Sequence, residues 1–173
     1  MEFEFNTRYH AMLAEAINQA NELEFIIDDI LAAEHFRKEN VDITEQAYFD
    51  YIEKKLQGNQ LSGKCEALLT MPNVAPLLVY ESINPEAVQR LLKEWRNLRN
   101  RFAHGLIVHN GSGVPVLYHK GYCYDIESHV SKFFQLNGQV LSIVTVLEKL
   151  KSEYNGRPVL LDADCDPDHP IYA

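Results

Sequence analysis

The chain has 173 residues, of which 46% are hydrophobic and 24% charged, and its net charge at neutral pH is -9. This balance fits one globular domain with a hydrophobic core and excludes an intrinsically disordered chain. Because the whole protein is acidic, its overall field repels nucleic acid, so a nucleic-acid-binding function requires a local cluster of basic residues.

The three cysteines, Cys65, Cys123 and Cys165, are scattered and form no CxxC pair. They predict neither a disulfide framework nor a zinc ribbon, which suits a reducing compartment. Residues 1–5 lack the basic start and apolar run of a signal peptide. No apolar stretch approaches the roughly 18 residues that a membrane span needs. We therefore expect a cytoplasmic protein that has no membrane contact.

Hydrophobic spacing predicts helices in the first half of the chain. Apolar residues recur every three or four positions from about residue 8 to 36, which predicts one long amphipathic helix. Thr44 is a favourable N-cap for a second helix that would end near Gly58. A shorter helix is expected over about 61–70, and residues 71–76, which contain two prolines, are expected to form a connector.

The clearest helix signals follow. Asn84 is a favourable N-cap, Pro85 suits the first helical position, and Gly105 is a natural stop. The buried stripe of this helix is expected to contain its large apolar residues: Val88, Leu91, Leu92, Trp95, Leu98 and Phe102.

Residues 106–124 differ from the rest because short apolar runs flank a Gly-rich loop, a pattern typical of a β-hairpin. A last long helix is expected after a cap at Asp125 or Ser128. We predict a mainly α fold: an antiparallel bundle of about four or five helices with a small β-hairpin before the last long one. One domain is expected over residues 1–155, followed by an acidic, Pro-containing tail over residues 156–173.

The third strong helix carries a local basic patch. Five of the chain's 16 Lys and Arg residues lie between Arg90 and Arg101, where Glu94 is the only acidic residue. Such a patch is what an acidic protein needs to bind a polyanion. The five residues are Arg90, Lys93, Arg96, Arg99 and Arg101.

Polar residues at the end of this helix can form a site. At about 100° per residue, Arg96, Asn100 and His104 share one stripe of a helix. Arg99 lies beside Asn100, so it can converge with this stripe if the helix unwinds slightly near Gly105. We expect these side chains to face away from the core, toward solvent or a second subunit.

This set of side chains suits a phosphodiester. An Arg guanidinium matches phosphate oxygens two at a time, His can give or take a proton, and Asn can orient the imidazole. RNA supplies its own nucleophile, the 2′-hydroxyl, so an acid, a base and a cation suffice without metal. One His per chain does not easily serve as both acid and base, whereas two copies across a two-fold axis supply both.

The segment Arg99-Asn100-Arg101-Phe102-Ala103-His104 resembles the RNxxxH form of the Arg–His motif of the HEPN superfamily (higher eukaryotes and prokaryotes nucleotide-binding). That family is a helical up-and-down bundle and is commonly dimeric. Its active members are metal-independent endoribonucleases, many of them toxins or antiviral effectors. The predicted hairpin at 106–124 departs from the minimal bundle of the family.

The resemblance implies a homodimer that acts on RNA, with an antitoxin protein as a further partner in the toxin form. Arg99 would bind and stabilise the scissile phosphate, His104 would be the general acid or base, and Asn100 would orient them. Neither a metal nor another cofactor is expected. The residues expected to hold the RNA backbone are Arg96, Arg101 and Lys93.

Two other interpretations use the same residues. His104 can simply cap carbonyls at a helix C-terminus while the arginines are solvated. Alternatively, the fold can serve a non-catalytic binding or regulatory protein, because some members of the superfamily are antitoxin-bound partners or mannitol-repressor-like regulators. The enzyme requires two motifs close together in a dimer. A regulator can have them buried, far apart or bound to its own acidic groups.

Residues outside the Arg–His motif are also considered as functional. His109 and His119 flank the hairpin, and His109 is close enough in sequence to reach the site. Such residues more often lie on the surface of a strand without a functional role. The alternating aspartates over residues 162–168 lack the Gly and Glu of a calcium loop, so we interpret them as a solvated tail. Four tyrosines can either stack on bases or pack in the core: Tyr48, Tyr51, Tyr122 and Tyr124.

Overall fold

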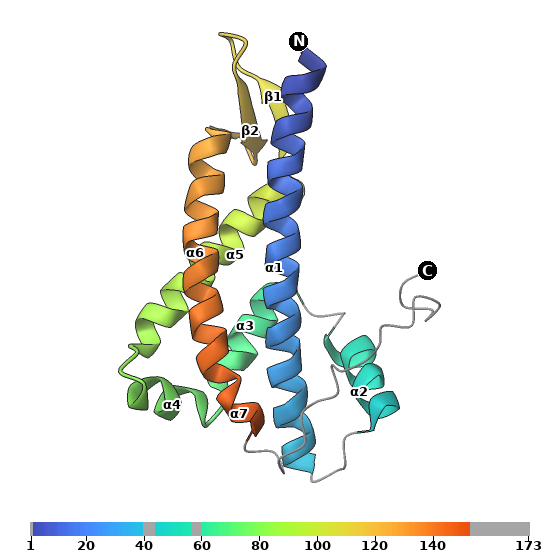
Figure 1. Ribbon diagram of the computed structural model, residues 1–173, viewed down its shortest axis with the longest axis vertical. Coiled ribbons are helices and arrows are strands. Elements are labelled where there is room, and N and C mark those ends of the chain that lie inside the picture. The colour runs from blue at the N-terminus through green and yellow to red at the C-terminus, as the bar shows by residue number, and fades with distance from the viewer. Residues whose placement is uncertain (1, 40–43, 57–59, 153–173) are drawn as a thin grey trace.

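The computed structural model describes residues 2–39, 44–56 and 60–152 (Figure 1). This part of the chain is mainly helical with one small antiparallel sheet, so the predicted mainly α class is confirmed. Gly58 and the tail over residues 156–173 lie outside the described residues. None of the described helices is long and apolar enough to cross a membrane.

The elements follow one another in this order: α1 (Glu2–Glu39), α2 (Glu45–Tyr51), the π-helical turn η1 (Ile52–Leu56), α3 (Leu61–Thr70), α4 (Val74–Tyr80), α5 (Pro85–His104), β1 (Leu106–His109), β2 (Pro115–His119), β3 (Tyr122–Tyr124), α6 (Ile126–Leu147) and α7 (Lys149–Ser152).

Two predicted helix starts are confirmed by their capping bonds. The Thr44 hydroxyl accepts a hydrogen bond from the backbone N–H of Ala47 at 3.2 Å. The Asn84 side chain accepts one from the N–H of Glu86 at 2.9 Å, and Pro85 occupies the first turn of α5. Both caps satisfy donors that have no partner within the helix itself.

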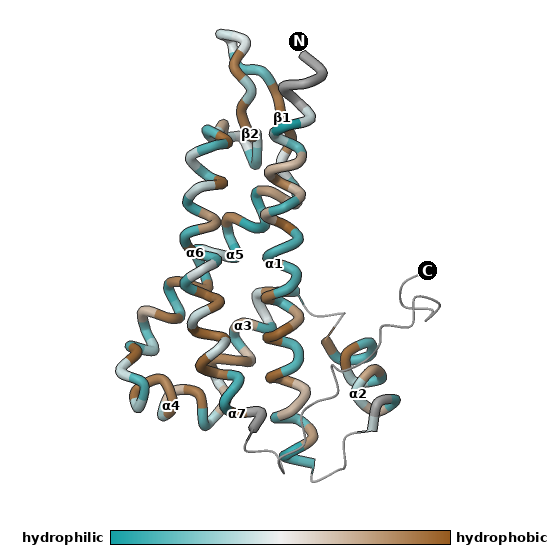
Figure 2. The backbone as a smooth tube through the Cα atoms, viewed as in Figure 1, coloured by the Kyte–Doolittle hydropathy of each residue, from teal (hydrophilic) through white to brown (hydrophobic). Residues whose placement is uncertain are grey.

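The predicted connector over residues 71–76 is wrong in its second half, because α4 begins at Val74. Pro76 lies in the first turn of that helix, where its missing N–H would have had no helical partner in any case. Figure 2 shows that α4 is hydrophobic along most of its length. Val74 and Leu78 are buried, whereas Val79 is exposed.

The two longest helices, α1 and α6, lie side by side and run in the same direction (Figure 1). Arg8 of α1 pairs with Glu127 near the start of α6 at 3.0 Å. Further along both helices, Asn137 donates a hydrogen bond to Gln19 at 3.2 Å. The helix between them in sequence, α5, runs in the opposite general direction and packs against both.

The core is fixed by a buried polar contact as well as by apolar packing. Trp95 of α5 is fully buried, and its indole N–H donates to the Asn137 side chain of α6 at 3.0 Å. Because Asn137 also bonds to Gln19, this one residue connects α1, α5 and α6. A buried Trp needs such a partner for its N–H, so the contact fixes the rotation of α5 about its own axis.

The predicted hairpin over 106–124 is a three-stranded sheet of order β1-β2-β3. Leu106 pairs with Tyr118, and Tyr118 pairs in turn with Cys123. The loop between β1 and β2 is held by Asn110, whose side chain accepts from the N–H groups of Ser112 and Val114, each at 3.0 Å. The sheet continues directly from the end of α5 and leads into α6.

Gly105 joins α5 to the sheet at a point where no side chain fits. A Cβ at this position would lie 2.5 Å from the Arg101 carbonyl oxygen and 2.6 Å from Cδ1 of Leu117. Leu117 is fully buried, so it cannot move aside without disturbing the core.

We predict that Gly105→Ala lowers the free energy of unfolding by about 1–3 kcal/mol, because it overpacks this junction. Gly138→Ala is the matched control, since a Cβ there meets nothing within 4 Å. This change within α6 should raise the stability by about 0.5–1 kcal/mol. Urea unfolding measures both, and equal effects of the two substitutions would contradict the predicted clash.

Candidate nucleic-acid interface

The basic stretch lies on α5, whose end is more regular than expected. The helix continues to His104, and the N–H of Gly105 still donates to the carbonyl of Arg101 at 2.8 Å. The slight unwinding near Gly105 that would bring Arg99, Asn100 and His104 together is therefore absent.

Arg99 lies against α1. Its Nη2 donates to Oδ1 of Asn21 at 3.3 Å and lies 3.6 Å from Oε2 of Glu24. The side chain is only 22% exposed, and its Nε is buried without a hydrogen-bond partner. The expectation that Arg99 faces away from the core is therefore wrong. It follows Trp95 by four residues, which places it next to the buried stripe.

Glu24 also binds a buried lysine of α3. Nζ of Lys64 lies 2.8 Å from Glu24 and 2.7 Å from Asp28, and this lysine side chain is 5% exposed. Burial raises the pKa of Asp28, and the charge of Lys64 opposes that rise only in part. Burial lowers the pKa of Lys64, but its hydrogen bonds to Asp28 and Glu24 outweigh burial and leave that pKa raised. Arg99 thus borders a charged cluster that joins α1, α3 and α5.

The other two motif residues point elsewhere. Asn100 is half-buried and His104 is exposed. Each residue of a regular helix advances by about 100° around the axis. Arg99 and His104 are five residues apart, so they lie about 140° apart around it. Within one chain, the three motif residues do not form a single site.

His104 is instead close to a second histidine. The ring of His119, on β2, hydrogen-bonds to the backbone of His104. Partial burial lowers the pKa of His119, and the charges of Lys120, Arg101 and His104 add to this effect. His119 of β2 therefore lies at the end of α5, within range of the charges of Arg101 and His104.

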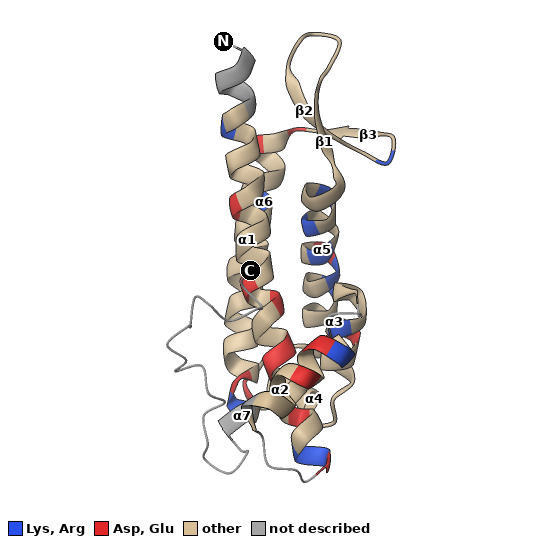
Figure 3. Cartoon of the chain, turned by 90° about the vertical axis from the view of Figure 1, so that its right-hand side faces the viewer, with Lys and Arg blue, Asp and Glu red and all other residues tan. Residues whose placement is uncertain are grey.

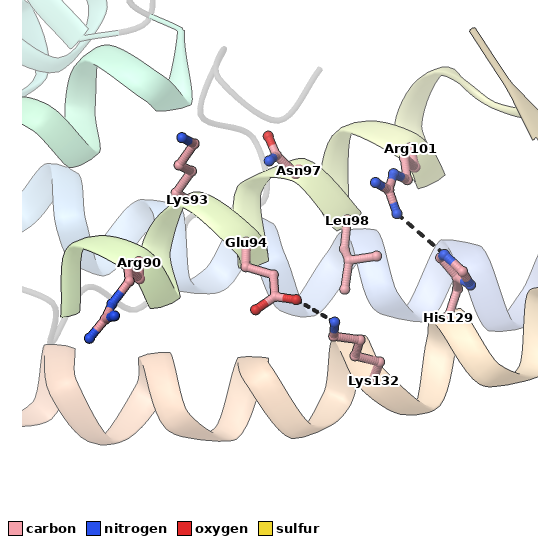
Figure 4. A pocket seen from close by; sticks show the side chains of 8 residues that line it. All are labelled: Arg90, Lys93, Glu94, Asn97, Leu98, Arg101, His129 and Lys132. Carbon is pink, nitrogen blue, oxygen red and sulfur yellow. Dashed lines mark hydrogen bonds and ion pairs between the residues drawn. The ribbon is translucent and has the colours of Figure 1, made fainter. Parts of the chain in front are cut away.

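A surface pocket of about 390 Å³ lies between α5 and α6 (Figure 4). Figure 3 shows Lys and Arg along α5, whereas Asp and Glu gather near α2. Lys132 of α6 pairs with Glu94 across the pocket. Arg90 and Lys93 form no ion pair within the described part of the chain, so their charges are available to a ligand. The lining comprises Arg90, Lys93, Glu94, Asn97, Leu98, Arg101, His129 and Lys132.

Arg101 and His129 close one end of the pocket. Nη1 of Arg101 lies 3.3 Å from Nε2 of His129, and Nδ1 of His129 lies 3.0 Å from the carbonyl oxygen of Asp125. Arginine can only donate, so Nε2 accepts and Nδ1 carries the proton that is donated to the carbonyl. Burial lowers the pKa of His129, and the charge of Arg101 contributes in the same direction. A neutral imidazole fits this arrangement.

The structure separates the three residues expected to hold RNA. Lys93 and Arg101 line the pocket, whereas Arg96 does not. Arg96 is half-buried on the side of α3, where its charge opposes the effect of burial that raises the pKa of Cys65 to about 11.

Sequence reasoning missed the contribution of α6 to this pocket. His129 and Lys132 are three residues apart, so they share one face of a helix. That spacing was visible, but nothing in the sequence indicated that this face lies opposite the basic face of α5.

Comparisons with protein-family models, with curated proteins and with solved structures find no match for this chain. Among the described residues, no group of three or more His, Cys, Asp or Glu side chains is arranged to hold a metal ion.

We predict that His129 titrates below its ordinary pKa of 6.5 and that Arg101→Met moves the pKa upward. Since the pKa of the folded state is lowered, the contribution of His129 to stability is present above pH 6.5 and is lost as the pH falls through the lowered value. Histidine resonances in an NMR titration measure the pKa. Arg90→Met is the control, and an equal shift in both variants would contradict a direct effect of Arg101.

Proposed function

We propose that this chain is an RNA-binding protein of the HEPN type that holds the phosphate backbone along α5. The observation that carries the proposal is the gathering of basic side chains around one pocket in a protein whose net charge is -9. The overall field opposes a polyanion, so a local cluster of this kind is what RNA binding would require. The cluster is formed by Arg90, Lys93, Arg101, His129 and Lys132.

The arrangement matches an extended ligand better than a small one. Arg90 and Arg101 are eleven residues apart on α5, which separates them by roughly 16 Å along the helix axis. Several consecutive phosphates fit along such a length. Lys132 is held by Glu94, so a phosphate would have to compete for that lysine, whereas Lys93 is available directly.

The position of Arg99 favours binding over catalysis within one chain. The acidic groups of α1 hold this arginine beside the core, and His104 lies on another side of α5. A non-catalytic or regulatory protein can have its motif in this state, whereas an enzyme built on Arg99 and His104 would need a second copy to complete the site. The homodimer and an antitoxin partner accordingly belong to the enzyme proposal.

We predict that the double variant Arg90→Ala, Lys93→Ala weakens binding to a labelled mixed-sequence RNA at low salt. Each lost phosphate contact should reduce the slope of log K against log salt by about 0.7, so the double variant should lose about 1.4. Fluorescence anisotropy at several salt concentrations measures both quantities. Lys38→Ala and Lys54→Ala together remove the same charge from exposed sites on α1 and η1. Equal behaviour of the two double variants would contradict the proposed interface.

A specific observation supports RNA cleavage as a second candidate function. The ring of His119 hydrogen-bonds to the backbone of His104 within one chain, with the charge of Arg101 near them. One imidazole would take the proton of the 2′-hydroxyl as its oxygen bonds to phosphorus. The other would protonate the departing 5′-oxygen as its bond to phosphorus breaks, and a cyclic phosphate would remain. Arg101 would stabilise the charge that develops on the phosphate.

If this second candidate holds, the parent protein cleaves RNA in EDTA, and His104→Ala and His119→Ala each abolish the cyclic-phosphate product. Arg99→Ala distinguishes the two possible sites, because it should impair cleavage only if Arg99 takes part. Circular dichroism checks that each variant is folded. A folded parent that binds RNA but leaves a mixed pool uncut would exclude this candidate and leave the binding function.

A further inference from the structure

Two tyrosines of β3 extend the basic pocket toward the end of α5. The Tyr124 ring lies 4.8 Å from the ring of His129, and Cζ of Arg101 lies 4.5 Å from its centroid. The Tyr122 ring lies 6.4 Å from that of Tyr124 and is tilted by 40° relative to it. Tyr122 is 67% exposed, so the row ends in a ring that is open to solvent.

The other tyrosines considered for base stacking are occupied within the fold. Tyr48 is buried, and its hydroxyl donates to Asp29 at 3.0 Å. The Tyr51 ring is stacked on that of His35 at 4.2 Å. Both belong to the contact of α2 and η1 with α1. Their role is packing, whereas Tyr122 and Tyr124 adjoin the basic pocket.

We propose that Tyr122, supported by Tyr124, is a base-stacking ring, so that the preferred ligand of the basic pocket is single-stranded RNA. The inference rests on the proposed RNA-binding function and names the substrate class. In a duplex the bases are stacked on one another and offer no free face. In a single strand each base can lie on an aromatic ring while the neighbouring phosphates lie in a basic groove.

The backbone holds this surface in place before any ligand arrives. Tyr122 pairs with His119 in the β2–β3 register, and the Tyr124 ring contacts both Arg101 and His129. Tyr rings on paired strands have few rotamers to lose, so little conformational entropy opposes stacking. Arg101 contacts both the pocket and the aromatic row, which connects phosphate binding to base binding in one continuous surface.

The test compares Tyr122→Ala with two controls. Tyr122→Phe retains the ring, and Tyr80→Ala removes a tyrosine that is 84% exposed on α4. The probes are a labelled single-stranded RNA of about ten nucleotides and the duplex of the same sequence. We expect Tyr122→Ala to weaken single-strand binding about tenfold, with little change for the duplex or for either control.

Two further readouts separate stacking from charge. Tyr122→Ala should leave the salt dependence of binding unchanged, because no phosphate contact is lost. A 2-aminopurine placed within the single strand should be quenched when it binds the parent protein and should stay bright with Tyr122→Ala.

The outcomes of this test separate the stacking surface from the proposed RNA-binding function. RNA binding that depends on Arg90 and Lys93 but is unaffected by Tyr122→Ala overturns the stacking surface and leaves the proposed function in place. Equal losses for single strand and duplex also overturn it, because they indicate a contact with the backbone. Absence of any RNA binding overturns the proposed function itself. A protein ligand in place of RNA would give that last result.

Discussion

The buried indole N–H of Trp95 needs an acceptor inside the core, and the Asn137 side chain of α6 supplies it. Apolar contacts are not directional, so packing of the buried stripe alone leaves α5 some freedom to rotate about its axis. The directional bond to Asn137, itself bonded to Gln19 of α1, removes that freedom. The face of α5 opposite Trp95 is then turned outward, and this is the face that carries Lys93 and Arg101.

Much of the fold could be predicted from the sequence because its signals are local. Thr44 and Asn84 bond to N–H groups two or three residues away, so their roles as caps depend on nothing distant. The start of α4 was missed because a proline was taken as a breaker, although Pro76 lies in the first turn, where it is tolerated. Only a hairpin was predicted over residues 106–124, because the three residues of β3 leave too little pattern to separate a strand from a turn.

The site was less predictable because it depends on which helices meet. The periodicity and charge of the stretch from Arg90 to Arg101 predicted a basic helix surface, and Lys93 and Arg101 line the pocket. The same periodicity could not indicate that α1 presents Glu24 to Arg99, because the two residues are far apart in the chain. For the same reason His129 gave no signal, since its importance comes only from the packing of α6 against α5.

The loop, strands and helices that form the basic and aromatic surface come from one uninterrupted stretch of chain, from Arg90 to Lys132. The longest helix, α1, supplies the support for this stretch and none of its pocket lining. Exposed residues of this stretch, such as Tyr122, can change without disturbing the support, whereas its buried residues, such as Trp95, cannot. Related chains could therefore diverge in the polyanion they select while the helices beneath remain the same.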